Sequence, residues 1–288
     1  MDVTIGALIT PENGDIPRMR DAWVDAEAIG ADRLYVSDHF FVPRPADYHA
    51  QRRVVDGLSI EQEPETSDPD HGEEPKNFEA ATLQAAMCAT TSRAEISCLV
   101  HCNAYRNPNL LADMARTMDH LSNGRFVLGI GSGFHVRDFV EYGYELGTYG
   151  SRLRDLDRDL DVIKSRWQKL VPPPTRKIPI LMAGGGEKLA LKIVAKHADA
   201  WHYFGSLDNL RHKSAVLDTW CEEIGRDPKQ ICRAVELTPD LGAGPDEAVE
   251  ASFTHLIARA TGPEWDLGLL RELLSWRDSR ARAQVGQP

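Results

Sequence analysis

Polar side chains follow two of the short β-branched runs of this sequence, where a parallel α/β fold places functional groups. Asp38 and His39 end the run RLYVS, and His101 and Arg106 follow the run EISCLV. Histidine changes its charge near neutral pH and is therefore suited to proton transfer. These side chains are candidates for acid–base and cofactor-binding chemistry if the strands before them end at one common edge.

Two glycine runs indicate an anion site. Gly184, Gly185 and Gly186 follow an apolar run and are followed by Lys188, and GIGSG (129–133) follows another apolar run. Adjacent glycines let backbone N–H groups approach an anion, and a helix N-terminus with a lysine adds positive charge. A phosphate fits this arrangement. A tight turn between strand and helix is the alternative for both runs.

Metal-dependent and serine-dependent hydrolysis are disfavoured. The chain has no HExxH string, and Asp38 and His39 are neighbours, so on an extended strand their side chains point to opposite sides. Ser132 lies between glycines, but the strand-turn-helix context and ordered partners of a hydrolase are not apparent. We therefore expect no metal site.

Strand-like and helix-like segments alternate along the chain. Eight βα units in 288 residues predict a (β/α)8 TIM barrel that occupies residues 1–288 as one domain. A doubly wound sheet has the same local pattern and is the alternative. The expected strands are 3–9, 33–37, 95–100, 126–130, 178–182, 200–203, 232–237 and 253–258. The expected helices include 15–29, 78–90, 108–121, 152–170, 187–197 and 207–224.

The segment 41–76 interrupts this alternation with a long acidic, proline-containing stretch after the second strand. Loops of this length are uncommon in compact domains. A lid over the catalytic face and a solvated acidic excursion are both compatible with it.

Composition excludes several classes of protein. The chain has 44 acidic and 33 basic residues and a formal charge of -11, which argues against nucleic-acid binding. No apolar stretch approaches the roughly 18 residues of a membrane helix, and the N-terminus lacks a basic signal region. Five cysteines without a CxxC pair are typical of reduced thiols. We expect a cytoplasmic protein.

Four segments in order, RLYVSDHF, YRNP…LSNGRFVLGIGSGF, YGSRLRDLDRDLDVIK and PILMAGGGEK, resemble the luciferase-like monooxygenase superfamily. The string SDHF resembles the branch of oxidoreductases that use the deazaflavin coenzyme F420. The resemblance implies a barrel with a flavin or deazaflavin at its mouth, a small-molecule substrate and a homodimer. It implies hydride transfer with F420, or alternatively an FMN-dependent monooxygenase.

The resemblance also assigns roles to residues. The ring-proximal histidine falls on His39, as the catalytic residue, beside Asp38. A non-proline cis peptide falls near Cys98-Leu99, against the ring. The remaining cofactor contacts and the cations that offset cofactor charge fall on Gly184, Gly185, Gly186, Lys188, Tyr149, Ser151, Arg152 and Arg106.

Two departures from the family pattern stand out. The sugar-phosphate dehydrogenase branch carries a glutamate directly after the glycines of the fourth strand, and Phe134 stands there in this chain. The usual insertion before the fifth strand is nearly absent. A catalytically silent barrel that binds a flavin is therefore a further alternative.

Overall fold

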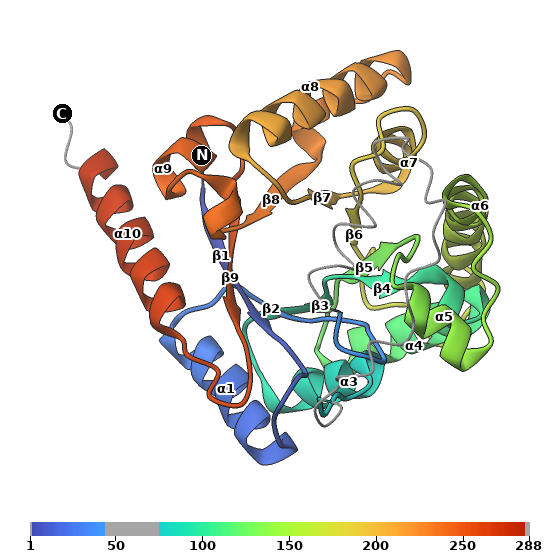
Figure 1. Cartoon of the computed structure of the whole chain (residues 1–288), viewed down its shortest axis with the longest axis horizontal. Helices are drawn as coiled ribbons and strands as arrows, with labels where there is room; N and C mark the ends of the chain where they lie inside the picture. The colour runs from blue at the N-terminus through green and yellow to red at the C-terminus, as the bar shows by residue number, and fades with distance from the viewer. Residues whose placement is uncertain (1, 44–74, 286–288) are drawn as a thin grey trace, which may run out of the picture.

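Nine parallel strand segments form one sheet in the computed structural model, which describes residues 2–43 and 75–285 (Figure 1). The strands are β1 (Thr4–Ile9), β2 (Arg33–Val36), β3 (Glu95–Cys98), β4 (His101–Cys102), β5 (Leu128–Gly131), β6 (Ile180–Ala183), β7 (Ala200–His202), β8 (Cys232–Glu236) and β9 (His255–Ala260). Their order is β3-β2-β1-β9-β8-β7-β6-β5-β4. Because β3 and β4 are consecutive parts of one barrel strand, the sheet closes into the predicted (β/α)8 barrel.

A cis peptide bond between Leu99 and Val100 separates β3 from β4. It lies one residue beyond the position near Cys98-Leu99 that the family resemblance implies. An isolated bridge joins Ile96 to Phe126, so β3 and the start of the β5 segment adjoin and close the barrel.

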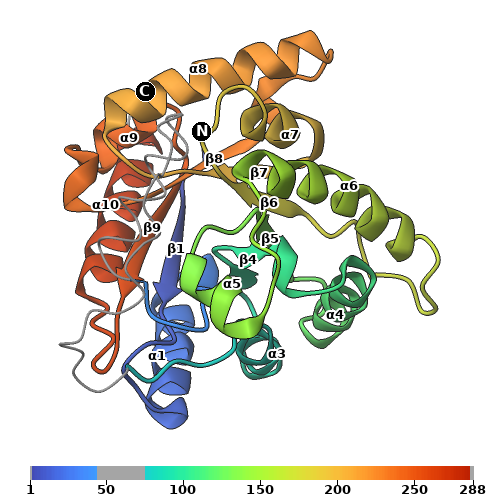
Figure 2. The same cartoon turned by 45° about the vertical axis from the view of Figure 1, so that its right-hand side comes forward.

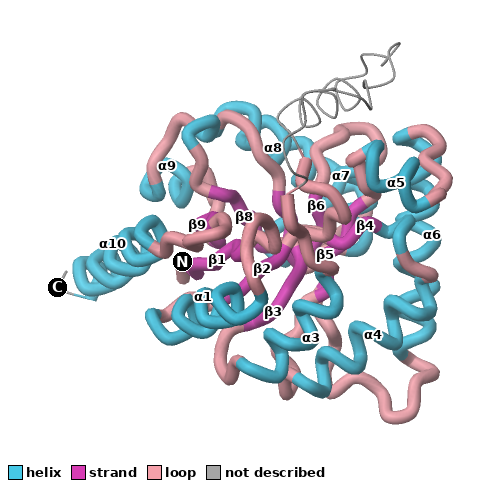
Figure 3. Tube along the Cα trace, turned by 60° about the horizontal axis from the view of Figure 1, so that its bottom comes forward, coloured by secondary structure: helices cyan, strands magenta, loops and turns pink. Residues whose placement is uncertain are grey.

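Helices surround the strands (Figure 3). They are α1 (Ile16–Ile29), α3 (Ala80–Thr90), α4 (Pro108–Leu121), α5 (Val136–Tyr142), α6 (Tyr149–Trp167), α7 (Ala190–His197), α8 (Leu207–Glu223), α9 (Pro245–Glu250) and α10 (Gly268–Val285). None of the described helices is both long enough and apolar enough to cross a membrane. Of the long segment 41–76, for which a lid and a solvated excursion were both left open, residues 44–74 lie outside the described part of the chain.

Local sequence explains where most of the helices begin. The Asn107 side chain accepts from the N–H groups of Asn109 and Leu110, and Pro108 takes the first position of α4, so α4 begins where it was predicted. The helix α7 begins at Ala190 rather than at Glu187, because the three residues before it form a turn.

Buried apolar side chains pack on both faces of the barrel sheet. The larger cluster lies between the strands and the helices and includes Trp23, Phe126 and Phe253. The inner one comes from alternate strand positions and comprises Leu8, Tyr35, Val127, Leu181, Ala200, Ala234 and Ile257. The same inward face meets the mouth two residues further along most of these strands, and four residues beyond Val127, where more of its side chains are polar.

The inward face at the mouth carries Thr10, Ser37, Gly131, Ala183, His202, Glu236 and Arg259. One side of this layer is therefore polar and the other, at Gly131 and Ala183, is nearly free of side chains. Burial lowers the pKa of His202 to about 4, against the opposing charge of Glu236. His202 is thus neutral in the folded protein at neutral pH.

The depressed pKa of His202 makes stability depend on pH. The unfolded chain binds a proton near pH 6.5 and the folded chain only near pH 4, so the contribution is present above pH 6.5 and is lost as the pH falls toward 4. The full loss corresponds to about 3 kcal/mol. We expect His202→Asn to lose less unfolding free energy than the wild type between pH 7 and pH 4, as measured by urea denaturation. The same substitution at exposed His120 is the control and should follow the wild type; equal acid sensitivity of the His202 variant and the wild type would contradict the assignment.

Candidate functional site

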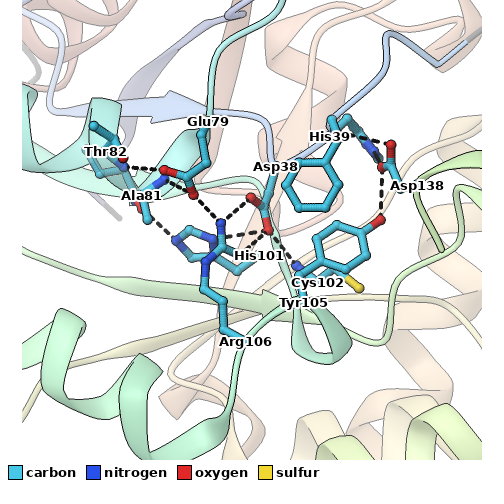
Figure 4. Close-up of polar contacts among 12 residues, drawn as sticks. Asp38, His39, Glu79, Ala81, Thr82, His101, Cys102, Tyr105, Arg106 and Asp138 are labelled. Atoms are coloured by element: carbon cyan, nitrogen blue, oxygen red, sulfur yellow. Dashed lines mark hydrogen bonds and ion pairs between the residues drawn. The ribbon is translucent and has the colours of Figure 1, made fainter. Parts of the chain in front are cut away.

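The buried carboxylate of Asp138 joins three segments at the mouth of the barrel. It lies on α5, which stands in front of the strands in Figure 2. Its Oδ1 accepts hydrogen bonds from the backbone N–H groups of Phe40 (3.1 Å) and Phe41 (3.0 Å). Its Oδ2 accepts from Tyr105 Oη (2.9 Å) and His39 Nδ1 (3.1 Å). The segments after β2, after β4 and after β5 therefore meet at one carboxylate (Figure 4).

The donors around Asp138 keep it ionised. Burial alone would raise the pKa of Asp138, but hydrogen bonds from His135 and His39 hold it well below its usual range. Burial and the nearby negative charges raise the pKa of Tyr105 far above its ordinary value, so Tyr105 stays a donor.

His39, the predicted catalytic residue, lies at the rim of this cluster. Its side chain is 18% exposed, whereas that of Asp138 is fully buried. Its ring makes edge contacts with the rings of Phe134 (5.2 Å) and His135 (5.4 Å). With Nδ1 bound to Asp138, the Nε2 edge is the part of the ring left for a ligand.

Asp38 forms a second buried cluster. Its two oxygens accept from Arg106 at 2.7 and 2.8 Å, and Oδ2 also accepts from the N–H of Cys102 at 3.0 Å. His101 lies 3.3 Å away through Nδ1, and Arg106 also pairs with Glu79 (Figure 4). Burial would raise the pKa of Asp38, but His101 and Arg106 lower it well below its usual range. Arg106 is thus held by two carboxylates rather than left free to offset cofactor charge.

The predicted anion loop lies between β6 and α7. Among the described residues nothing accepts a hydrogen bond from the N–H groups of Gly185 and Gly186. A Cβ on Gly186 would lie 3.0 Å from Tyr149 Oη, so the loop adjoins the N-terminus of α6 as predicted. Lys188 is exposed beside it. Gly184 has a φ of +144°, a conformation that favours glycine.

The side chain of Glu187 points away from this loop. It pairs with Lys213 Nζ (2.6 Å) and His212 Nε2 (3.0 Å) on α8, and its backbone carbonyl accepts from Trp220 Nε1. These partners lower the pKa of Glu187. The negative charge of Glu187 is therefore compensated by α8, on a side of the loop away from the unpaired N–H groups of Gly185 and Gly186.

Ser151 and Arg152, two further residues predicted to contact the cofactor, have different hydrogen-bond partners in the structure. The Ser151 side chain forms a capping box with Thr148 at the start of α6. Arg152 donates to the carbonyls of Gly133 (3.3 Å) and Leu146 (2.9 Å) and has no carboxylate partner among the described residues. Burial lowers its pKa.

Cys98 and Leu99 lie at the junction of β3 and β4. Cys98 is fully buried, and burial raises the pKa of its thiol. Leu99 and Val100 pack on the inner apolar cluster. Cys98 thus packs as a buried core residue, while Leu99 contributes to the apolar surface below the mouth.

Several buried polar atoms at the mouth have no partner among the described residues: Thr10 Oγ1, Ser37 Oγ and His202 Nε2. Each lies where a strand ends, on the inward face. Buried polar atoms in folded proteins are usually hydrogen-bonded. This polar side of the mouth fits a heteroatom-rich ring that can donate and accept at its edge.

Asp138 is among the polar residues that follow the fourth predicted strand, but sequence reasoning assigned it no role. The available signal was the spacing of His135 and Asp138, three residues apart at the start of a helix that was itself not predicted. Ligand atoms of His39, His135 and Asp138 lie within 4.8 Å of one another, a set that could also hold a metal ion.

Comparisons with known proteins identify relatives that use different cofactors. An F420-dependent glucose-6-phosphate dehydrogenase of Amycolatopsis mediterranei is 27% identical over 192 residues, which cover 61% of this chain and 48% of that enzyme. The chain thus matches about half the length of that relative.

Solved structures share the fold. An F420-dependent secondary alcohol dehydrogenase, solved with an F420-acetone adduct, superimposes with a TM-score of 0.74 at 15% identity over 94% of this chain and 98% of that one. The oxygenating constituent of 3,6-diketocamphane monooxygenase from Pseudomonas putida, solved with FMN, gives 0.58 at 16% identity over 83% and 67%. The sequence model of the luciferase-like monooxygenase family matches residues 3–285. The chain therefore belongs to the luciferase-like monooxygenase family.

Proposed function

We propose that this protein is an F420-dependent oxidoreductase that transfers a hydride between the deazaflavin and a small organic substrate. The observation that carries the proposal is the mouth itself, where the ring of His39 is partly exposed and Thr10, Ser37 and His202 each have a buried polar atom without a partner among the described residues. The F420-dependent dehydrogenases among the similar proteins support it.

The described residues fit the deazaflavin. Leu99 and Val100 would form the apolar support of its ring, and the polar atoms at the mouth would bind the ring's carbonyl and N–H groups. The N–H groups of Gly185 and Gly186, with Lys188, would bind its phosphate. When bound, the cofactor supplies a two-electron hydride, which amino-acid side chains cannot supply.

The chain contributes orientation and a proton. His39 Nε2 is the atom that can give a proton to a substrate oxygen, or take one from it, because Nδ1 is bound to Asp138. Phe134, in contact with the His39 ring, offers no second proton at that point.

Cofactor choice is the direct test. We expect calorimetric titration of the purified protein to show tighter binding of F420 than of FMN, and reduced F420 bound to the protein to pass hydride to an acceptor. Tenfold tighter binding of FMN, about 1.4 kcal/mol, with oxygen-consuming turnover would instead assign a monooxygenase. Binding of either cofactor without turnover of any acceptor would assign a silent binding barrel.

Replacing His39 should separate chemistry from binding. We expect His39→Ala to lower hydride transfer by about 10² to 10⁴, because a positioned proton donor contributes that much, while F420 affinity stays close to wild type. His120→Ala, at an exposed position that bonds the Pro173 carbonyl, is the matched control. Unchanged turnover in His39→Ala would leave this residue a packing role only.

The proposed phosphate site at Gly185, Gly186 and Lys188 is best tested by reversing the charge of Lys188. A Cβ on Gly185 would lie 2.3 Å from the Tyr203 ring, so substitutions at Gly185 would disturb packing as well as binding. We expect Lys188→Glu to weaken F420 binding about tenfold at low salt, and less at high salt because screening reduces the effect. Lys229→Glu, an equally exposed reversal in the turn before β8, is the control. Equal affinity of both variants would place the phosphate elsewhere.

A further inference from the structure

The two oxygens of Asp138 have different partners, and this difference fixes the orientation of the carboxylate. The N–H groups of Phe40 and Phe41 bind Oδ1, and side chains bind Oδ2. A backbone N–H can only donate, so Oδ1 must remain an acceptor. The side chains on Oδ2 also meet an acceptor, since the carboxylate carries no proton of its own.

This arrangement determines which nitrogen of His39 carries hydrogen. Its Nδ1 lies 3.1 Å from Asp138 Oδ2 and can bond it only as an N–H donor. In the neutral ring the hydrogen is then on Nδ1 and Nε2 is an acceptor. In the cationic ring Nε2 carries the transferable proton.

The other neighbours of His39 do not fix its tautomer. Phe134 and His135 make edge contacts with the ring, and the side chain of Phe134 has no hydrogen-bonding atom. Glu12 interacts with His39 electrostatically, and burial raises the pKa of Glu12. Among the described residues, Asp138 is the carboxylate that is hydrogen-bonded to the His39 ring.

We propose that Asp138 is the positioning residue of the active site: it holds His39 as the Nδ1–H tautomer and thereby makes Nε2 the atom that exchanges a proton with the substrate. This inference rests on the proposed function for its chemistry. When a carbonyl substrate gains a hydride at carbon, its oxygen gains a proton from Nε2, and His39 is left neutral. In the reverse direction neutral Nε2 takes the alcohol proton as the hydride leaves.

Asp138 Oδ2 has two further neighbours. Tyr105 Oη donates a hydrogen bond to it at 2.9 Å, and His135 Nδ1 lies 3.2 Å away as an ion-pair contact. A metal ion bound by His39, His135 and Asp138 through these atoms would need both Nδ1 atoms without hydrogen. The 3.1 Å between His39 Nδ1 and Asp138 Oδ2 is the separation of a hydrogen bond, and metal binding is therefore an outcome of the test that would overturn the proposal.

The tautomer can be read without cofactor. Two-bond 15N–1H correlation spectra of the whole protein, with histidine labelled and His39→Gln used to assign the signal, should show His39 as the Nδ1–H form at pH 8. In Asp138→Asn the N–H groups of Phe40 and Phe41 should keep the amide oxygen on their side. The amide NH2 then faces His39, and we expect the Nε2–H form.

Tyr105→Phe is the matched control. It removes one donor from the same oxygen, leaves the carboxylate in place, and should keep His39 in the Nδ1–H form. In the loaded enzyme Asp138→Asn should lower kcat by about 10² to 10⁴ with little change in KM or F420 affinity.

The outcomes separate this inference from the proposed function. An Nε2–H form in the wild type, or an Nδ1–H form that persists in Asp138→Asn, would overturn the positioning role; the wild-type spectrum decides even if the variant does not fold. Loss of the Nδ1–H form of both His39 and His135 on addition of micromolar Zn²⁺ would make the cluster a metal site. That result would also overturn the positioning role. A correct tautomer without hydride transfer from F420 would reject the proposed function and leave the assignment of Asp138 as the tautomer-setting group intact.

Discussion

Asp38 and Asp138 are buried carboxylates, and each is stabilised only because separate segments of the chain bring donors to it. Removing a carboxylate from water costs several kcal/mol unless charge and hydrogen bonds compensate it. Arg106 and the N–H of Cys102 compensate Asp38, and the residues after β2 compensate Asp138. The segments that follow β2, β4 and β5 are therefore held together by charge and hydrogen bonding rather than by apolar packing alone.

The two carboxylates place neighbouring residues in opposite environments. Asp38 and His39 are adjacent, and extended backbone sends their side chains to opposite sides. Asp38 is buried against Arg106, while His39 reaches the mouth with Asp138 behind it. Asp38 thus anchors the segment, while the adjacent His39 keeps part of its ring exposed.

The sequence predicted what periodicity and local signals specify. The helix α4 was predicted because Pro108 and Asn123-Gly124 mark its ends, and the structure adds Asn107 as its N-cap. The family resemblance assigned cofactor contacts to both the glycine loop and the N-terminus of α6, and the structure places Tyr149 close to Gly186. Local signals do not indicate the partners of Glu187, because Lys213 and His212 are on α8, about 25 residues further along the chain.

What escaped prediction depends on contacts between distant segments. The short helix α5 has little periodicity, and Asp138 acquires its role from Phe40, Phe41 and Tyr105, which are 33 to 98 residues away. Arg106 was expected to offset cofactor charge, but no local pattern shows that Asp38 and Glu79 would surround it. Tertiary contacts of this kind determine which of several polar residues remains available to a ligand.

Phe134 does not by itself argue that the barrel lost its activity. An unsatisfied buried polar atom costs about 1–3 kcal/mol, and Thr10, Ser37 and His202 each have one at the mouth without a partner among the described residues. Three such atoms on one inward layer would be a heavy cost for a fold with nothing to bind. A ligand that supplied their hydrogen bonds would offset that cost. Under the proposed function, proton exchange at the mouth would then fall to His39, whose Nδ1 is hydrogen-bonded to Asp138, and the phenylalanine side chain at 134 would not be needed for it.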